Sequence, residues 1–107
     1  MEEIEVINDK EDETQNQDPN EVIELQSDME DEMKKLIPGM IIEGFKEKTE
    51  YEDIAKYIKD ECDKAFGEEF LCIIVDNHAG FGSCLRCAPG TLYMGKYQDN
   101  RIIIFKI

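Results

Sequence analysis

The pattern of hydrophobic and polar positions predicts one short strand followed by two amphipathic helices. Val22 to Leu25 is a short run with strand character. Apolar residues then recur at the spacing of one helix face from Met29 to Phe45, and again from Ile54 to Phe66. Pro38 interrupts the first of these patterns, and we expect a kink or a shortened helix there because proline removes a backbone donor. Gly67 follows the second pattern, in the position where helices commonly end.

Further strands are predicted after the second helix. Phe70 to Val75 is a continuous apolar run, which indicates a strand buried on both faces. Phe81 to Cys87 is also strand-like, but its small and polar residues would let another backbone approach closely, so we interpret it as an edge meant to be paired. Thr91 to Tyr97 and Arg101 to Ile107 should form a hairpin around the turn residues Gln98-Asp99-Asn100. This order predicts an α+β fold, with two helices packed on an antiparallel sheet of about five strands.

Both predicted helix starts carry capping signals. Ser27 and Glu30 have the spacing of a capping box, in which each side chain bonds the backbone of the other residue. Asp28 adds a negative charge where the helix dipole favours one. Thr49 and Glu52 repeat the capping-box spacing before the second helix. We therefore expect the helices to begin directly after Ser27 and Thr49.

Charge divides the chain into a tail and one domain. The formal net charge is −14, and residues 1–20 hold eight acids against one lysine. We expect a disordered acidic tail at 1–20 and a folded domain at 21–107, because the tail lacks apolar periodicity. Clustered basic residues are missing, which argues against nucleic-acid binding. No apolar run approaches the roughly 20 residues of a membrane span, and the acidic N-terminus differs from a secretory signal. These features predict a cytoplasmic protein with reduced cysteines.

Six sequence strings, in this order, resemble the type-eight dynein light chain family. They are Asp28-Met29-x-x-Glu32-Met33, Asp53-Ile54-Ala55-x-x-Ile58-Lys59-x-Glu61-x-Asp63-Lys64, Cys72-Ile73-Ile74, Phe81-Gly82-Ser83, Tyr93-Met94-Gly95 and Ile103-Ile104-Phe105-Lys106. The resemblance covers Val22 to Ile107. It implies a non-catalytic light chain of a dynein motor that needs no cofactor. It also implies a dimer in which the third strand of each chain, here Phe81 to Cys87, completes the sheet of its partner.

The resemblance further implies how such a module acts. Disordered peptide segments, such as those of dynein intermediate chains, would add as a further strand beside the exchanged strand and so promote motor assembly. In this kind of strand addition, main-chain hydrogen bonds supply affinity and side-chain pockets supply specificity. The resemblance places Phe81, Gly82, Ser83, Cys84, Leu85, Arg86, Tyr51 and Glu52 at the peptide groove, and Leu71 and Cys87 at the dimer interface.

Three departures from the family pattern change these expectations. Tyr51-Glu52 stands where the family has a Glu-Lys pair, so peptide choice should differ from the family norm. Leu71 stands where the family often has an interfacial histidine. Pro89-Gly90 shortens the third strand, which together with the acidic surface predicts a related light chain as the preferred partner, with a homodimer possible. Because cytoplasmic dyneins usually employ close copies of this family, a divergent chain points to the cytoskeleton of a cilium or flagellum and its axonemal dynein.

The cysteines leave a second class of function open. Cys62, Cys72, Cys84 and Cys87 could hold zinc, which accepts four thiolates, so a small cytosolic thiol or zinc-binding protein is the alternative. The spacing is unfavourable, because Cys62 and Cys72 are ten residues apart and do not form a close pair. His78 is the single histidine and stands in an Asn-His-Ala-Gly turn without a nucleophile beside it. We therefore expect no bound metal and no enzymatic activity.

Overall fold

The computed structural model describes residues 20–76 and 86–107. Their elements are β1 (Val22–Ser27), α2 (Asp31–Glu47), α3 (Tyr51–Phe66), β2 (Leu71–Asp76), β3 (Tyr93–Tyr97) and β4 (Asn100–Phe105). The predicted order of one strand, two helices and further strands is confirmed. Most of the strand predicted at Phe81 to Cys87 lies outside the described residues, and its last two residues, Arg86 and Cys87, belong to no strand.

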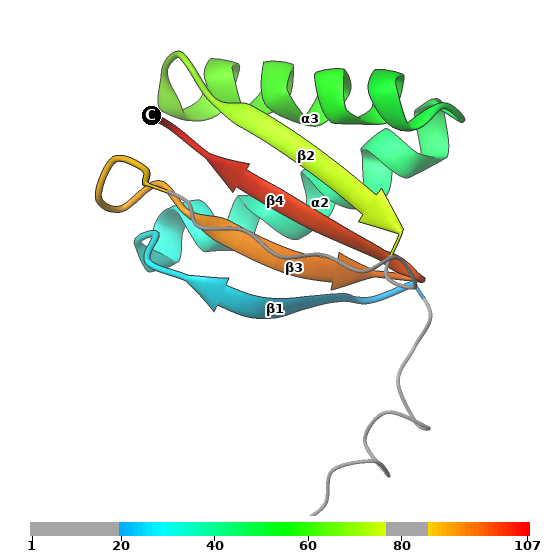
Figure 1. Cartoon of the computed structure of the whole chain (residues 1–107), viewed down its shortest axis with the longest axis horizontal. Helices are drawn as coiled ribbons and strands as arrows, with labels where there is room; N and C mark the ends of the chain where they lie inside the picture. The colour runs from blue at the N-terminus through cyan, green and yellow to red at the C-terminus, as the bar shows by residue number, and fades with distance from the viewer. Residues whose placement is uncertain (1–19, 77–85) are drawn as a thin grey trace, which may run out of the picture.

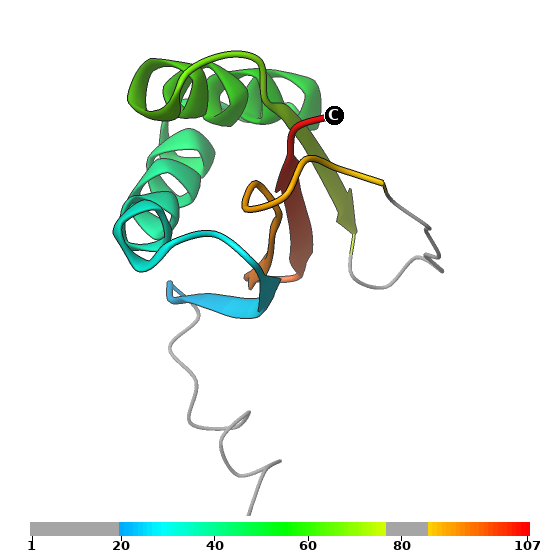
Figure 2. The same cartoon turned by 90° about the vertical axis from the view of Figure 1, so that its left-hand side faces the viewer.

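The four described strands form one antiparallel sheet in the order β1-β3-β4-β2. Both helices cover the same face of this sheet (Figures 1 and 2). Helix α3 contacts β2, while α2 contacts β1 and β3. The sheet therefore has β3 and β4 at its centre and β1 and β2 at its two edges. This two-layer arrangement is the predicted α+β fold.

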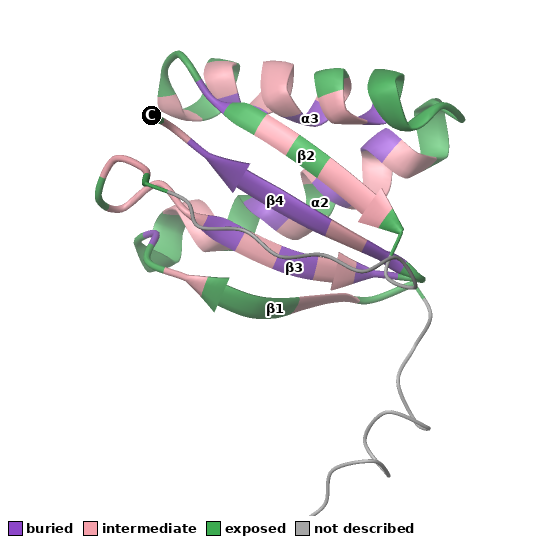
Figure 3. Cartoon of the chain, viewed as in Figure 1, coloured by how far each residue is buried: buried purple, intermediate pink, exposed green. Residues whose placement is uncertain are grey.

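The core lies between the helices and the inner face of the sheet. Its buried side chains come from both layers and include Ile37, Ile41, Ile54, Ile58, Cys62, Tyr93, Tyr97, Ile102 and Ile104. The helical members recur at one-turn spacing and the strand members recur at every second position, or at multiples of it. Strand β4 is buried along most of its length (Figure 3). The helical spacing that predicted α2 and α3 is thus the one that builds their side of the core.

The starts of both helices differ from the prediction. Helix α2 begins at Asp31 and α3 at Tyr51, and in neither does a side chain cap the first turn. The hydroxyl of Ser27 accepts the backbone N–H of Met29 at 3.1 Å and donates to the carbonyl of Leu92 at 2.8 Å. Both predicted capping boxes are therefore wrong; Ser27 is bonded to the segment before β3, a partner 65 residues away. Gly67 ends α3 with a φ of 95°, as predicted.

Helix α2 continues through Pro38 to Glu47, so of the two alternatives, a kink or a shortened helix, the shortened helix is wrong. Proline leaves the carbonyl four residues earlier without its helical donor. The residues on either side of this position that face the core, Ile37 and Ile41, are completely buried. Their burial holds the helix together across the proline.

Neither described helix has the length and apolar character needed to cross a membrane.

The hairpin between β3 and β4 is tighter than predicted. Tyr97 pairs with Asn100, which leaves the two-residue turn Gln98-Asp99. Gln98 has a φ of 55°, the left-handed conformation that two-residue hairpin turns require. Asn100, expected in the turn, is the first residue of β4 and is buried.

Candidate functional site at the sheet edge

Among the described strands β2 lies at an edge of the sheet, and no described strand pairs with its outer side. Among the described strands it pairs only with β4, in an unbroken register from Leu71 opposite Phe105 to Asp76 opposite Asn100. Leu71 and Ile73 are each 37% exposed, so the prediction that this strand is buried on both faces is wrong for the single chain. A regular apolar edge of this kind is a template on which another strand can pair.

The opposite edge of the sheet, β1, is protected. Its register with β3 shifts between Glu24 and Gln26, which is a β-bulge. The carboxylate of Glu24 forms an ion pair with Lys34 of α2 at 3.3 Å. Bulges and charged side chains are common means of keeping an edge strand from pairing with another chain. The contrast between the two edges makes β2 the candidate interaction site.

Two thiols belong to facing elements, that of Cys62 in α3, which is buried, and that of Cys72 in β2, which is partly buried. Cys62 belongs to the core, and Cys72 of β2 packs against it. Burial raises the pKa of the Cys62 thiol to about 12 and raises the pKa of the Cys72 thiol as well. Both thiols therefore stay protonated at neutral pH, whereas zinc binding and thiol chemistry require the thiolate. They act as small apolar side chains of the core.

The zinc alternative also needs the other two cysteines. Cys87 is a partly buried free cysteine, and Cys84 lies outside the described residues. Over residues 20–76 and 86–107, no three His, Cys, Asp or Glu side chains are grouped closely enough to hold a metal ion. The geometry that is described thus gives the zinc hypothesis no support.

The beginning of β2 is fixed to the end of α3 by a charged cluster. The carboxylate of Asp63 accepts the backbone N–H of Phe70 at 2.8 Å and pairs with Lys59. The hydrogen bond from Lys59, followed by that from Phe70, lowers the pKa of Asp63. Lys59 also lies 3.5 Å from Glu69. Strand β2 therefore enters the sheet at a fixed position beside α3.

The start of α3 lies at the other end of β2. The hydroxyl of Tyr51 donates a hydrogen bond to the side-chain oxygen of Asn100, which is 8% exposed. Asn100 stands opposite Asp76, the last residue of β2. Glu52 is exposed beside Tyr51. Tyr51 therefore lies near the Asp76 end of β2, with Glu52 next to it in α3, and their role in a groove stays a prediction.

Asp28 and Lys106 hold the segment before β3. The carboxylate of Asp28 accepts the backbone N–H of Gly90 and that of Leu92, both at 2.9 Å. These two bonds, the Gly90 bond first, lower the pKa of Asp28. The N–H of Ala88 donates to the carbonyl of Lys106 at 2.8 Å. Asp28 was expected to favour the helix start, and no local pattern points to its distant partners.

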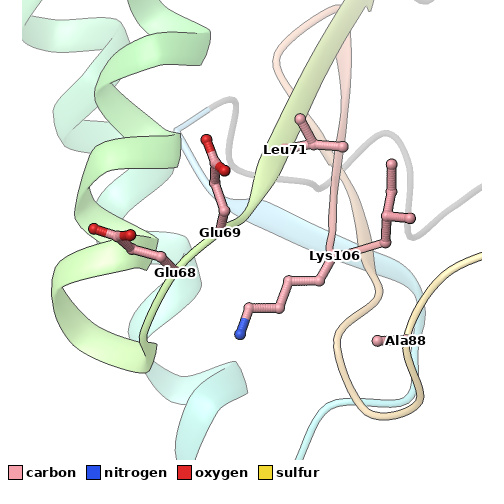
Figure 4. A pocket seen from close by; sticks show the side chains of 6 residues that line it. Glu68, Glu69, Leu71, Ala88 and Lys106 are labelled. Carbon is pink, nitrogen blue, oxygen red and sulfur yellow. The ribbon is translucent and has the colours of Figure 1, made fainter.

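A hollow of about 540 Å³ opens at the start of β2 (Figure 4). Its lining residues are Glu68, Glu69, Leu71, Ala88, Lys106 and Ile107. The ammonium group of Lys106 lies 5.1 Å from the centre of the Phe70 ring, which is a cation–π contact. Leu71 belongs both to the hollow and to β2, so the hollow is continuous with the open edge.

The remaining predicted site residues are only partly described. Phe81, Gly82, Ser83, Cys84 and Leu85 lie outside the described residues, Arg86 is exposed, and Cys87 is partly buried. Leu71 lies at the open edge, as a residue of an interface would. That Phe81 to Arg86 line a peptide groove, and that Leu71 and Cys87 lie at a dimer interface, stays a prediction.

The fold and its open edge define a small α+β domain suited to pairing with another protein through a strand. Residues 21–107 match the model of the family described as dynein light chain type 1, and the chain therefore belongs to the dynein light chain family. No curated protein matches the chain.

Solved structures share this fold at low sequence identity. The dynein light chain-like domain of the Fasciola hepatica calcium binding protein FhCaBP2 superposes with a TM-score of 0.67 and 13% identity, over 81% of this chain and 92% of that one. The DLC-like domain of CsTAL3 gives a TM-score of 0.66 and 16% identity, over 83% and 94% of the two chains. At such identities the likeness establishes the fold alone, and the predicted dynein light chain-like fold is confirmed.

Proposed function

We propose that this chain is a divergent light chain of the type-eight kind, a non-catalytic dimeric module that binds disordered peptide segments by β-strand addition and promotes assembly of a dynein motor. The observation that carries the proposal is the edge of β2, which is regular and apolar and pairs with no described strand other than β4. The fold of the family is generally that of a non-catalytic adaptor. An edge that accepts a strand is the simplest way for such a module to bind its partners.

Two strands would be added to this edge in turn. The third strand of a partner chain, residues 81–87, pairs with the backbone of β2. Its side chains then cover Leu71 and Ile73, whose removal from water stabilises the dimer. A target peptide pairs with the far side of that exchanged strand, along Phe81 to Arg86. In this arrangement the partner's strand completes the binding site, and a single chain binds peptide poorly.

The start of α3 would set the peptide preference. Tyr51 and Glu52 stand at the Asp76 end of β2, beside the path of an added strand. Glu52 is exposed and offers a carboxylate to a basic or hydroxyl side chain of the peptide. The hydroxyl of Tyr51 is already bonded to Asn100, so Tyr51 offers the peptide mainly its ring.

Partners and location follow from the same proposal. The targets are disordered segments of dynein intermediate chains. The second protomer is a related light chain in preference to a second copy, and the purified chain on its own can also form a homodimer. The module works in the cytoplasm on the cytoskeleton, in the axoneme of a cilium or flagellum. Sedimentation of the chain alone and mixed one-to-one with a conventional light chain tests the choice of protomer.

The decisive experiment compares two single-lysine variants. Ile73→Lys places a charge on the open edge, whereas Leu36→Lys places one on α2, where the side chain is 51% exposed. We expect the parent chain and Leu36→Lys to sediment as dimers and to bind an intermediate-chain peptide. Ile73→Lys should sediment as a folded monomer that binds no peptide. A parent chain that stays monomeric at every concentration, or an Ile73→Lys variant that dimerises normally, would contradict the proposal.

A further inference from the structure

A buried asparagine joins the start of α3 to the sheet. Asn100 is the first residue of β4, where it pairs with Tyr97 on one side and with Asp76 of β2 on the other. Its side-chain oxygen accepts a hydrogen bond from the hydroxyl of Tyr51, and Asn100 is only 8% exposed. Because water has little access to this bond, Asn100 holds the Tyr51 side chain at the Asp76 end of β2.

The direction of this hydrogen bond decides what Tyr51 can still offer a ligand. An amide oxygen accepts and cannot donate, so the single hydroxyl proton of Tyr51 points to Asn100. Tyr51 is 45% exposed, and what remains for a ligand is the face of its ring, which attracts cations, and a lone pair of its oxygen. The ionised carboxylate of Glu52, the exposed next residue, also accepts and cannot donate. The two side chains together therefore offer acceptors and no donor.

The backbone at the start of α3 favours the opposite kind of ligand. No side chain caps this helix, and free N–H groups at a helix start can bind an anion. The carboxylates of Glu50, Glu52 and Asp53 are exposed at the same helix start. They offset its partial positive charge and repel a further anion. An acidic side chain of a ligand is therefore the weaker occupant.

We propose that Asn100 is a positioning residue for peptide binding, and that the start of α3 selects a lysine or arginine of the peptide over an amide or an acid. This inference rests on the proposed function, in which Tyr51 and Glu52 border the bound peptide. Asn100 acts through Tyr51, because it takes the proton that would otherwise bond the oxygen of a peptide amide or carboxylate. The peptide is thus basic where it meets Tyr51 and Glu52.

Three peptides that differ at one residue test this selection. They carry a Thr-Gln-Thr core, the usual one for type-eight light chains, or a Thr-Lys-Thr or Thr-Glu-Thr core in the same sequence. Binding to the full chain is measured by calorimetry. We expect the lysine peptide to bind about tenfold more tightly than the glutamine peptide and the glutamate peptide to bind most weakly. Lysine only donates, glutamine donates and accepts, and an ionised glutamate only accepts.

Variants of Asn100 and Tyr51 test the role of Asn100. Asn100→Leu removes the acceptor and frees the Tyr51 proton for the peptide, so the preference for lysine over glutamate should shrink about fivefold. Asn100→Asp keeps an acceptor for Tyr51 and should keep the order of the three affinities. Tyr51→Phe keeps the ring without the proton and should keep that order too. A general loss of structure lowers all three affinities together, whereas their ratio reports on the contact with the peptide.

The matched control is Gln26→Leu, which removes an exposed side-chain amide from β1 at the other edge of the described sheet. It should bind the three peptides as the parent does.

The outcomes separate the inference from the proposed function. A parent chain that binds the glutamine or glutamate peptide best overturns the inference while the proposed function stands. An Asn100→Leu variant with the parent's ratio of affinities overturns the role of Asn100. If Asn100→Leu does not fold, a changed order of affinities in Asn100→Asp or Tyr51→Phe overturns that role instead. A parent chain that binds none of the three peptides overturns the proposed function as well.

Discussion

The carboxylate of Asp28 accepts the backbone N–H of Gly90 at 2.9 Å, across 62 residues of sequence. Its second oxygen accepts the N–H of Leu92, so one side chain satisfies two donors of the segment before β3. This segment connects the predicted exchange strand to the sheet. Asp28 thus fixes the point from which that strand leaves the domain.

Replacing Asp28 should destabilise the domain. Asp28→Ala leaves two backbone donors without their acceptor, and we expect the thermal midpoint to fall by several degrees. Asp28→Asn keeps one acceptor oxygen, so its thermal midpoint should fall less. Asp31→Ala, which removes the same charge from the first turn of α2, is the matched control and should change the midpoint little.

The contribution of Asp28 should also depend on pH. Its hydrogen bonds hold the pKa below the ordinary value of 3.8, so the stabilisation is complete above that value and is lost as the pH falls through the folded-state pKa. Melting curves of the parent chain and Asp28→Ala should therefore differ at neutral pH and converge in strong acid. A gap of constant size across this range would mean that the charge of Asp28 is not what stabilises the turn.

Removing the hydroxyl of Tyr51 should destabilise the fold, because it leaves a buried amide oxygen without its hydrogen-bond donor. Tyr51→Phe leaves the side-chain oxygen of Asn100 without its donor, and Asn100 is 8% exposed. We expect a loss of about 1–3 kcal/mol in the free energy of unfolding, measured by urea denaturation. Glu52→Gln changes the exposed residue next to Tyr51 and should leave the denaturation midpoint unchanged. Equal stabilities for Tyr51→Phe and the parent would show that Asn100 finds another donor.

The buried cysteines should be unreactive in the folded chain. Burial raises the pKa of Cys62 to about 12 from an ordinary 9.0, and Cys72 is shifted in the same direction. A thiol reagent at pH about 8 should label them only after unfolding, since the thiolate is the reactive form. Because the unfolded chain loses these protons first, stability should fall as the pH rises from 9.0 towards 12. Rapid labelling of Cys62 in the native protein would contradict this, with Cys62→Ala identifying the labelled site by mass spectrometry.

Peptide preference should differ from that of conventional type-eight light chains. Tyr51-Glu52 replaces an acidic and a basic group, and the Tyr51 hydroxyl is committed to Asn100. Charge-assisted hydrogen bonds contribute about 1.5–3 kcal/mol each, so their loss should weaken binding by tenfold or more. Peptides with the usual Thr-Gln-Thr core should therefore bind weakly in calorimetry, and a Tyr51→Glu, Glu52→Lys variant should bind them better. Tight binding by the parent chain would refute this.

The sequence predicted the fold well because its signals are local and periodic. Ile54, Ile58 and Cys62 recur once per turn of α3, and Ile102 to Phe105 form a continuous apolar run in β4, so each element carries its own signal. For β2 the same reasoning wrongly predicted burial on both faces. A continuous apolar run is expected for a strand buried on both faces, and it is equally expected for a strand that another chain must cover.

Contacts between distant parts of the chain were the ones that sequence reasoning missed. Ser27 and Glu30 have capping-box spacing, but the Ser27 hydroxyl bonds Leu92, and α2 begins later. Which partner Ser27 chooses depends on where the turn at Pro89 lies in space. No local pattern contains that information. For the candidate site, the roles predicted for Tyr51 in a peptide groove and for Leu71 at a dimer interface stay predictions, while the charged hollow beside Leu71 could be found only from the fold.

The bulge in β1 sets a limit on the size of any assembly. A fibre of stacked sheets needs two usable edges on every subunit, one to receive the previous molecule and one to receive the next. Among the strands that the structure describes, only β2 presents a regular edge, while Glu24 and the bulge close the other side. Growth by strand pairing can therefore proceed from one side of each sheet only. A protein of this design can recruit extended segments along β2 and still remain a small, finite particle at high local concentration.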